Sequence, residues 1–192
     1  MTTSTTVAGR RGLTDHALFG MAVFVFTEVM LFAAFISAFT IVRNAVAPGL
    51  WPPEDQPRLP FERTALNTLL LLVSGVFVMR AQRAFARGGS GAARMPLTLG
   101  LVLGAAFVGL QGFEWASLIG QGLTLTSSQI GGFFYLIIGC HALHALLALG
   151  LLAVCWNGLR TGTLQRSRLA AANLFWGFVV LVWPVLWLVV YR

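Results

Sequence analysis

The chain has 192 residues, of which 57% are hydrophobic and only 10% are charged. Soluble domains carry about 25% charged residues, so this composition excludes an ordinary soluble domain and indicates an integral membrane protein. The net charge is +7, and every basic residue apart from histidine is an arginine. These arginines lie between apolar blocks, which is typical of membrane orientation signals, and we therefore expect no nucleic-acid partner.

Five apolar blocks are long enough to cross a bilayer as helices, since one crossing takes about 20 residues. The blocks are continuously apolar rather than alternating, which argues against membrane-spanning strands. We therefore predict an all-α, polytopic membrane protein, with a single membrane domain over 1–192 that forms a five-transmembrane-helix bundle. The predicted spans are about 18–42, 63–86, 96–118, 131–156 and 169–191.

The remaining segments are predicted to be loops. Residues 1–16 are mostly polar, and we predict that they form a flexible cytoplasmic N-terminus. The segment PGLWPPEDQPRLP (48–60) holds five of the seven prolines, so it cannot form a regular helix. The Gly-rich stretch 87–94 predicts a short turn, and 119–130 and 157–168 predict polar connections.

The arginines also predict the orientation. When the spans are followed in order, nine of the thirteen arginines fall on the same side of the membrane as the N-terminus. The positive-inside rule then places the N-terminus in the cytoplasm and the C-terminus outside. The nine are Arg10, Arg11, Arg80, Arg83, Arg87, Arg94, Arg160, Arg166 and Arg168.

A few polar side chains lie inside the spans, where ionisable groups usually face protein or a water-filled cavity and are functional candidates by default. One is a carboxylate within FVFTEVMLFAAF, near the middle of the first span. Two more polar residues lie in QGFEW of the third span, and two histidines lie in GCHALHALLALG of the fourth. These candidates are Glu28, Gln111, Glu114, His141 and His144.

Depth and spacing suggest how these residues meet. At about 1.5 Å per residue, Glu28 and the two histidines reach a similar depth, and residues three apart share a helix face. We expect Glu28 to be protonated or hydrogen-bonded to His141 or His144, and Gln111 and Glu114 to form a second cluster nearer the outer surface. Two interpretations stay open: a structural contact that fixes helix register, or a proton-related or lipid-related role.

The residue inventory argues against cofactor chemistry in this chain. Structural zinc sites use four ligands, and His141 and His144 have no further partners at a suitable depth. The three histidines are too few for a core with two haems and a copper. The sequence shows no phosphate-binding loop, dinucleotide fingerprint or nucleophile elbow. We therefore expect no catalytic residue and no metal or cofactor bound by this chain.

Taken together and in order, these segments resemble subunit III of the haem-copper respiratory oxidases, in its short five-helix bacterial form. The residues that carry the resemblance begin with Glu28, at the position of the family's intramembrane carboxylate. The others are Trp51, Pro52 and Pro53 of the external WPP loop, Asn67, Thr68 and Ser74 of the following helix, Gln111 and Glu114 of a Gln-x-x-Glu segment, and His141 and His144 of a Gly-x-His-x-x-His segment.

The last helix departs from the family's pattern. That pattern is Trp-His-Phe-Val-Asp, whereas this chain has Trp176, Gly177, Phe178, Val179 and Val180, so both polar residues are missing. The departure leaves open which complex the subunit serves. Relatives of this subunit also accompany nitric oxide reductases.

The resemblance implies a non-catalytic accessory subunit of a cytochrome c or quinol oxidase complex in a bacterial inner membrane. It implies contact with catalytic subunit I and with subunit II, support for the stability and proton uptake of subunit I, and phospholipid bound in the bundle. Haem and copper are then expected in the partner subunits. A small proton-coupled transporter is a further alternative, although the chain lacks the internal repeat that many transporters show.

Overall fold

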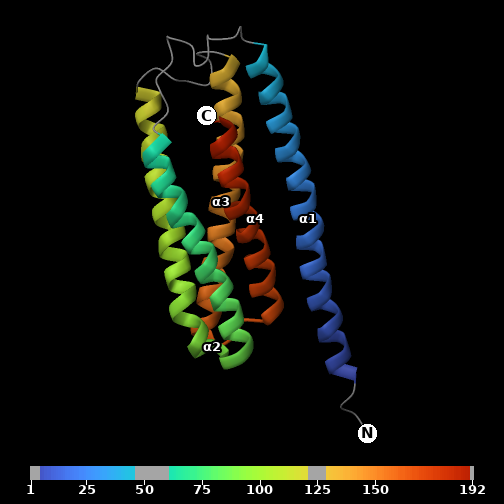
Figure 1. Cartoon of the computed structure of the whole chain (residues 1–192). Helices are drawn as coiled ribbons and strands as arrows, with labels where there is room; N and C mark the ends of the chain where they lie inside the picture. The colour runs from blue at the N-terminus through green and yellow to red at the C-terminus, as the bar shows by residue number, and fades with distance from the viewer. Residues whose placement is uncertain (1–4, 46–60, 121–128, 191–192) are drawn as a thin grey trace.

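The structure is a computed structural model that describes residues 5–45, 61–120 and 129–190. All regular elements in this part of the chain are helices, which confirms the all-α prediction (Figure 1). Each of them is long and apolar enough to cross a membrane. They are α1 (Thr5–Asn44), α2 (Phe61–Gly120), α3 (Gln129–Thr161) and α4 (Arg166–Val190).

Helix α2 folds back on itself as a hairpin. Its helical backbone is interrupted at Gly89, where φ is 72° and ψ is −160°. Glycine has no Cβ and adopts a positive φ without a steric penalty. The two arms then run antiparallel (Figure 1), and the Ser74 hydroxyl of one arm donates to the carbonyl of Gly100 in the other at 2.7 Å. Within the stretch 87–94 that we predicted as a turn, the backbone leaves the helical conformation at Gly89.

The close approach of the two arms depends on a second glycine. A Cβ on Gly100 would lie 2.7 Å from Cγ2 of Val78 and 3.4 Å from the backbone oxygen of Ser74. Small residues allow helix backbones to approach closely in membranes, where packing and hydrogen bonds hold helices together. Close packing of Gly100 against Val78 and the hydrogen bond from Ser74 to Gly100 therefore hold the two arms together.

The helices extend beyond the apolar blocks. Helix α1 begins at Thr5, although we predicted a loose segment over 1–16, and the predicted connection 157–168 is reduced to the residues between Thr161 and Arg166. Helical hydrogen bonds are made within the backbone, so they continue past the last apolar side chain. Gly162 reverses the chain there with φ of 72°. The predicted WPP loop lies outside the described residues.

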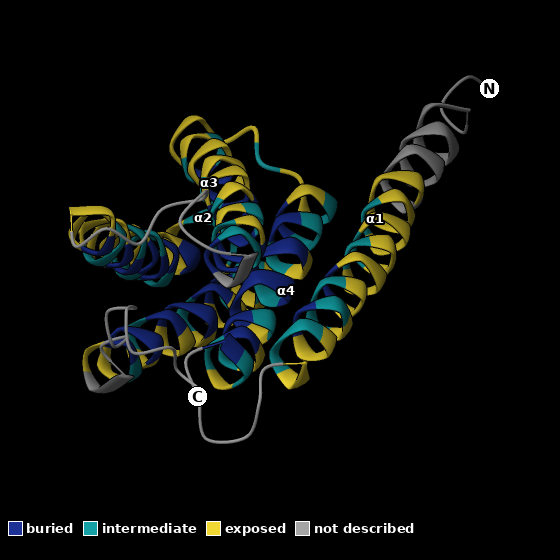
Figure 2. Cartoon of the chain, turned by 90° about the horizontal axis from the view of Figure 1, so that it is seen from above, coloured by how far each residue is buried: buried dark blue, intermediate teal, exposed yellow. Residues whose placement is uncertain are grey.

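Helix α4 is the centre of the bundle. It packs against α1, α2 and α3, whereas among the described helices α1 packs against α3 and α4 only. Figure 2 shows this arrangement from above, with buried positions concentrated on α4 and its neighbours and with α1 largely exposed at the margin. Trp176 and Trp183 of α4 are both completely buried. The core therefore lies between α4, α3 and the α2 hairpin, and α1 covers one side of it.

Candidate functional site

The intramembrane carboxylate of α1 meets a histidine of α3. Oε2 of Glu28 lies 3.0 Å from Nε2 of His144, and their side chains are 16% and 8% exposed. The contact predicted between the first and fourth spans is therefore present, and His144 rather than His141 makes it. Three residues turn a helix by about 300°, so two histidines at this spacing share a broad face but point in directions about 60° apart.

The other ring nitrogen of His144 fixes its tautomer. Nδ1 lies 2.7 Å from the carbonyl oxygen of Cys140, one helical turn earlier. A carbonyl oxygen only accepts, so Nδ1 carries a proton. The contact between Nε2 and Glu28 then also needs a proton, which belongs either to a protonated carboxyl or to an imidazolium. In both cases the pair holds one shared proton and has no net charge.

Aromatic rings pack around the imidazole of this pair. The His144 ring centroid lies 5.5 Å from that of Phe32, and 6.0 Å from each of the Phe175 and Phe178 centroids. Phe24 stacks against the same imidazole at 6.4 Å. An apolar shell of this kind strengthens electrostatic interactions and makes an unpaired polar group costly. The shell therefore favours a closed Glu28–His144 contact.

His141 occupies a different environment. It is only 1% exposed, and its ring lies 5.1 Å from that of Trp183 and 6.2 Å from that of Phe32, measured between centroids. Neither ring nitrogen has a hydrogen-bond partner among the described residues. His141 thus faces the interior of the bundle, while His144 faces α1.

The second predicted cluster is present within the α2 hairpin. Gln111 donates through Nε2 to Oε2 of Glu114 at 3.0 Å, and the Thr64 hydroxyl donates to the same oxygen at 3.1 Å. Asn67 extends the cluster, because its Nδ2 lies 3.1 Å from Oε1 of Gln111 and 3.2 Å from the carbonyl oxygen of Phe107. These contacts join the two arms of α2 near the end of the bundle that holds the C-terminus.

Our sequence reasoning had not assigned Thr64 and Asn67 to this cluster. A signal for them was available, since both are uncharged polar residues at the start of an apolar span and are three positions apart. Residues at this spacing share a helix face, and polar side chains in spans often form hydrogen bonds across helices.

Two tryptophans attach α4 to the first arm of the hairpin. The indole nitrogen of Trp176 donates to the Ser74 hydroxyl at 3.1 Å, and that of Trp183 donates to the Thr68 hydroxyl at 2.9 Å. All four side chains are buried. Thr68 and Ser74, two of the three positions that resemble the family's Asn-Thr and Ser pattern, thus hold the hairpin to the central helix.

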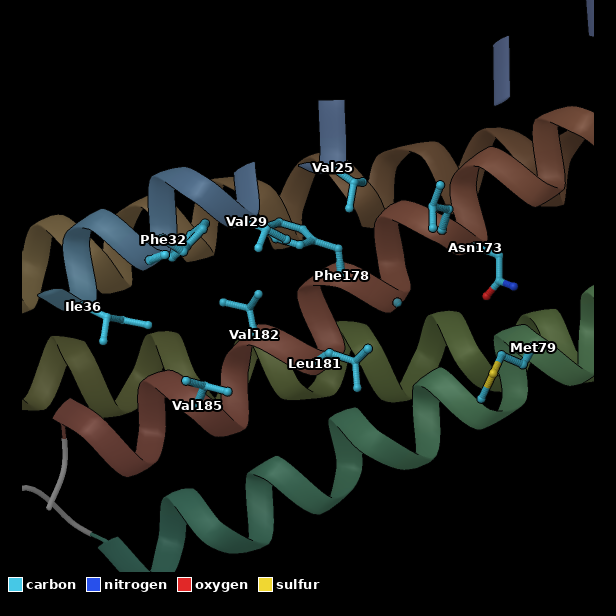
Figure 3. A pocket seen from close by; sticks show the side chains of 13 residues that line it. Val25, Val29, Phe32, Ile36, Met79, Asn173, Phe178, Leu181, Val182 and Val185 are labelled. Atoms are coloured by element: carbon cyan, nitrogen blue, oxygen red, sulfur yellow. The ribbon is translucent and has the colours of Figure 1, made fainter. Parts of the chain in front are cut away.

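An apolar cavity of about 540 Å³ lies between α1 and α4, with Met79 of α2 at its edge (Figure 3). Val25, Val29 and Phe32 line it from α1. Gly177 of α4 also lines it, and a Cβ at this glycine would have no atom within 4 Å. The cavity is therefore open at the position where the family pattern has a histidine.

The described part of the chain contains no group of three or more His, Cys, Asp or Glu side chains that could hold a metal ion. The partly buried carboxylates Glu28 and Glu114 are instead hydrogen-bonded to imidazole, amide and hydroxyl groups. Such an arrangement can hold helices in register.

The fold and these polar clusters define a polytopic helical membrane protein. Residues 2–192 match the sequence model of the family described as cytochrome c oxidase subunit III, and the chain belongs to this family. This confirms the resemblance seen in the sequence and places the chain among the membrane proteins of respiratory chains.

Individual relatives cover nearly the whole chain. Cytochrome c oxidase subunit 3 of Synechocystis sp. is 30% identical over 187 residues, which is 95% of this chain and 78% of the relative. The protein of the same name from Pisaster ochraceus is 35% identical over 182 residues, covering 90% and 68%. That of Gadus morhua is 34% identical over 180 residues, covering 90% and 68%.

Proposed function

We propose that this chain is the non-catalytic accessory subunit III of a haem-copper terminal oxidase in a bacterial inner membrane. The observation that carries the proposal is the match of residues 2–192 to the subunit III family, together with the Glu28–His144 pair at the family's carboxylate position. Oxidase subunits I and II are the proposed partners. Haem and copper belong to those partners in this proposal, and this chain binds neither.

The membrane topology in this proposal has five crossings. The 58 residues Arg63–Gly120 are too many for one crossing, and their reversal at Gly89 divides them into two arms of suitable length. In Figure 1 the reversal, the α3–α4 connection and the start of α1 lie at the same end of the bundle. Seven arginines flank the reversal and the connection: Arg80, Arg83, Arg87, Arg94, Arg160, Arg166 and Arg168. Their gathering supports a cytoplasmic location for this end.

The proposed support for proton uptake centres on Glu28. Its carboxyl shares a proton with His144, which lies near the middle of α3 and is packed by aromatic rings. Intramembrane ionisable residues commonly serve proton movement or stabilise a neighbouring subunit. In this role the pair retains one proton and holds α1 against α3, so that subunit I meets a fixed surface.

Phospholipid is the proposed occupant of the cavity between α1 and α4. Its lining is almost entirely apolar, with valine, leucine, isoleucine and phenylalanine side chains, which suits an acyl chain better than a polar ligand. Gly177 adds space on the α4 side.

Isolation of the complex in a mild detergent tests the proposal. An affinity tag on this chain should recover a haem-copper core, recognised by its haem spectrum and by copper analysis. Recovery of a core with haem and non-haem iron would instead support the accessory protein of a nitric oxide reductase. Uptake of a substrate by vesicles that contain this chain alone would support a transporter. Recovery of the chain without any partner would contradict the proposal.

A further inference from the structure

Two buried polar groups near Trp183 have no hydrogen-bond partner among the described residues. One is the imidazole of His141, both of whose nitrogens are unpaired, and the other is Oδ1 of Asn67. His141 is 1% exposed and Asn67 is 3% exposed. More than nine in ten buried backbone polar groups, and most buried side-chain polar atoms, find a partner in protein or in ordered water, so these atoms require an explanation.

The ring of His141 packs against the indole of Trp183, and Asn67 adjoins residues that contact the same indole. The Trp183 ring is 5.1 Å from that of His141, and its nitrogen donates to Thr68, the residue after Asn67. The Trp183 ring also lies 5.2 Å from that of Phe107, and the carbonyl oxygen of Phe107 accepts from Asn67. His141 and Asn67 thus belong to the packing of α3, α4 and the α2 hairpin around Trp183.

We propose that this region binds internal water, with His141 and Oδ1 of Asn67 as its ligands. A neutral imidazole has one donor and one acceptor nitrogen, and an amide oxygen only accepts. Water can donate to the oxygen and to one nitrogen and can accept from the other. Buried waters typically make about three hydrogen bonds to polar groups that would otherwise be unsatisfied.

The water site would lie between the two polar clusters of the protein. Asn67 already belongs to the cluster of Gln111 and Glu114, and His141 is one helical turn from His144. Water held by both residues would therefore connect the hydrogen bonds of the hairpin with the neighbourhood of the Glu28–His144 pair.

Water-edited solid-state NMR of the full chain in phosphatidylcholine vesicles tests this site, with ¹⁵N-labelled histidine and isoleucine. Magnetisation should pass from water to the His141 ring several times faster than to the amide of Ile138, which is 1% exposed and lies one turn away. Transfer to His141 as slow as that to Ile138 would overturn the proposal. The spectrum of a His141→Gln variant assigns the His141 signal.

A variant of the second ligand tests whether the water is shared. Asn67→Leu should slow the transfer to His141 several-fold, whereas Leu71→Ile, a change at a buried position of the same helix arm, should not. An unchanged rate in Asn67→Leu would contradict the role of Asn67 as a ligand. The wild-type comparison remains decisive if the Asn67 variant does not fold.

Discussion

Glu28 and His144 lie 3.0 Å apart through Oε2 and Nε2, although 116 positions separate them in the chain. This contact joins α1, the helix at the margin of the bundle, to α3. A second hydrogen bond joins α1 to α4 at the C-terminal end of α1, where Arg43 donates to the carbonyl oxygen of Val189 at 3.2 Å. These two polar contacts and the packing against α4 hold α1 in place.

Two substitutions of Glu28 should distinguish the contribution of its hydrogen bond to His144 from that of its ionisable carboxyl group. Glu28→Gln keeps a donor for the free nitrogen of neutral His144, so we expect assembly close to wild type. Glu28→Ala leaves that nitrogen buried without its partner, and we expect a loss of about 1–3 kcal/mol in the free energy of unfolding. Denaturant unfolding in detergent and the yield of the copurified complex are the measurements. An alanine variant that assembles and turns over like wild type would show that Glu28 has no supporting role.

Replacing both Glu28 and His144 should lower the free energy of unfolding by less than the sum of the two single replacements. The double variant Glu28→Leu with His144→Leu leaves no unpaired buried group, so its loss should be smaller than the sum of the two single losses. We expect a coupling energy of about 0.5–3 kcal/mol, measured by a double-mutant cycle on unfolding. If the loss in the double variant equals the sum of the two single losses, the two side chains do not interact.

Gly104 should not tolerate even one added methyl group. A Cβ there would lie 2.7 Å from Cζ2 of the buried Trp176 and 3.0 Å from Cδ2 of Leu149. Overpacking of this kind typically costs about 1–3 kcal/mol, so Gly104→Ala should lower the unfolding midpoint. Gly109→Ala is the matched control, since a Cβ there meets nothing within 4 Å. Equal midpoints for the two variants would contradict the packing seen here.

Asn67→Leu should weaken the α2 hairpin. The change keeps the number and branching of the side-chain heavy atoms but removes the donor to Oε1 of Gln111 and to the carbonyl oxygen of Phe107. The buried Gln111 oxygen then loses this donor, and we expect destabilisation of about 1–3 kcal/mol. Leu69→Ala, at a position that is 55% exposed, provides a control on the same arm. Unfolding in detergent compares the two, and a greater loss in Leu69→Ala would be inconsistent with the cluster.

Filling the cavity should displace lipid without unfolding the protein. Gly177→Leu places a side chain into open space between α1 and α4, so the purified protein should carry less bound phospholipid. Gly139→Leu is the control, because position 139 is exposed, lies outside the cavity lining and also has open space at its Cβ. Mass spectrometry of lipids retained after delipidating washes is the measurement. Equal retention of phospholipid in both variants would show that the cavity is not a lipid site.

The hairpin of α2 shows where sequence reasoning was sufficient and where it stopped. The apolar runs before and after 87–94 predicted two crossings, because bilayer thickness sets the length of a spanning helix. The Gly-rich composition predicted a turn between them, but five glycine and alanine positions there could have provided it. Only the structure shows that the interruption falls at Gly89.

The sequence by itself determined the fold class, the family and the candidate polar side chains Glu28, Gln111, Glu114, His141 and His144. These follow from composition, from local spacing and from the order of the motifs. The tertiary structure decided that Glu28 pairs with His144, that His141 faces Trp183, and that Asn67 and Thr64 join the Gln111–Glu114 cluster. The rotation of each helix about its axis depends on packing against the whole bundle, and no local segment of the sequence specifies that rotation.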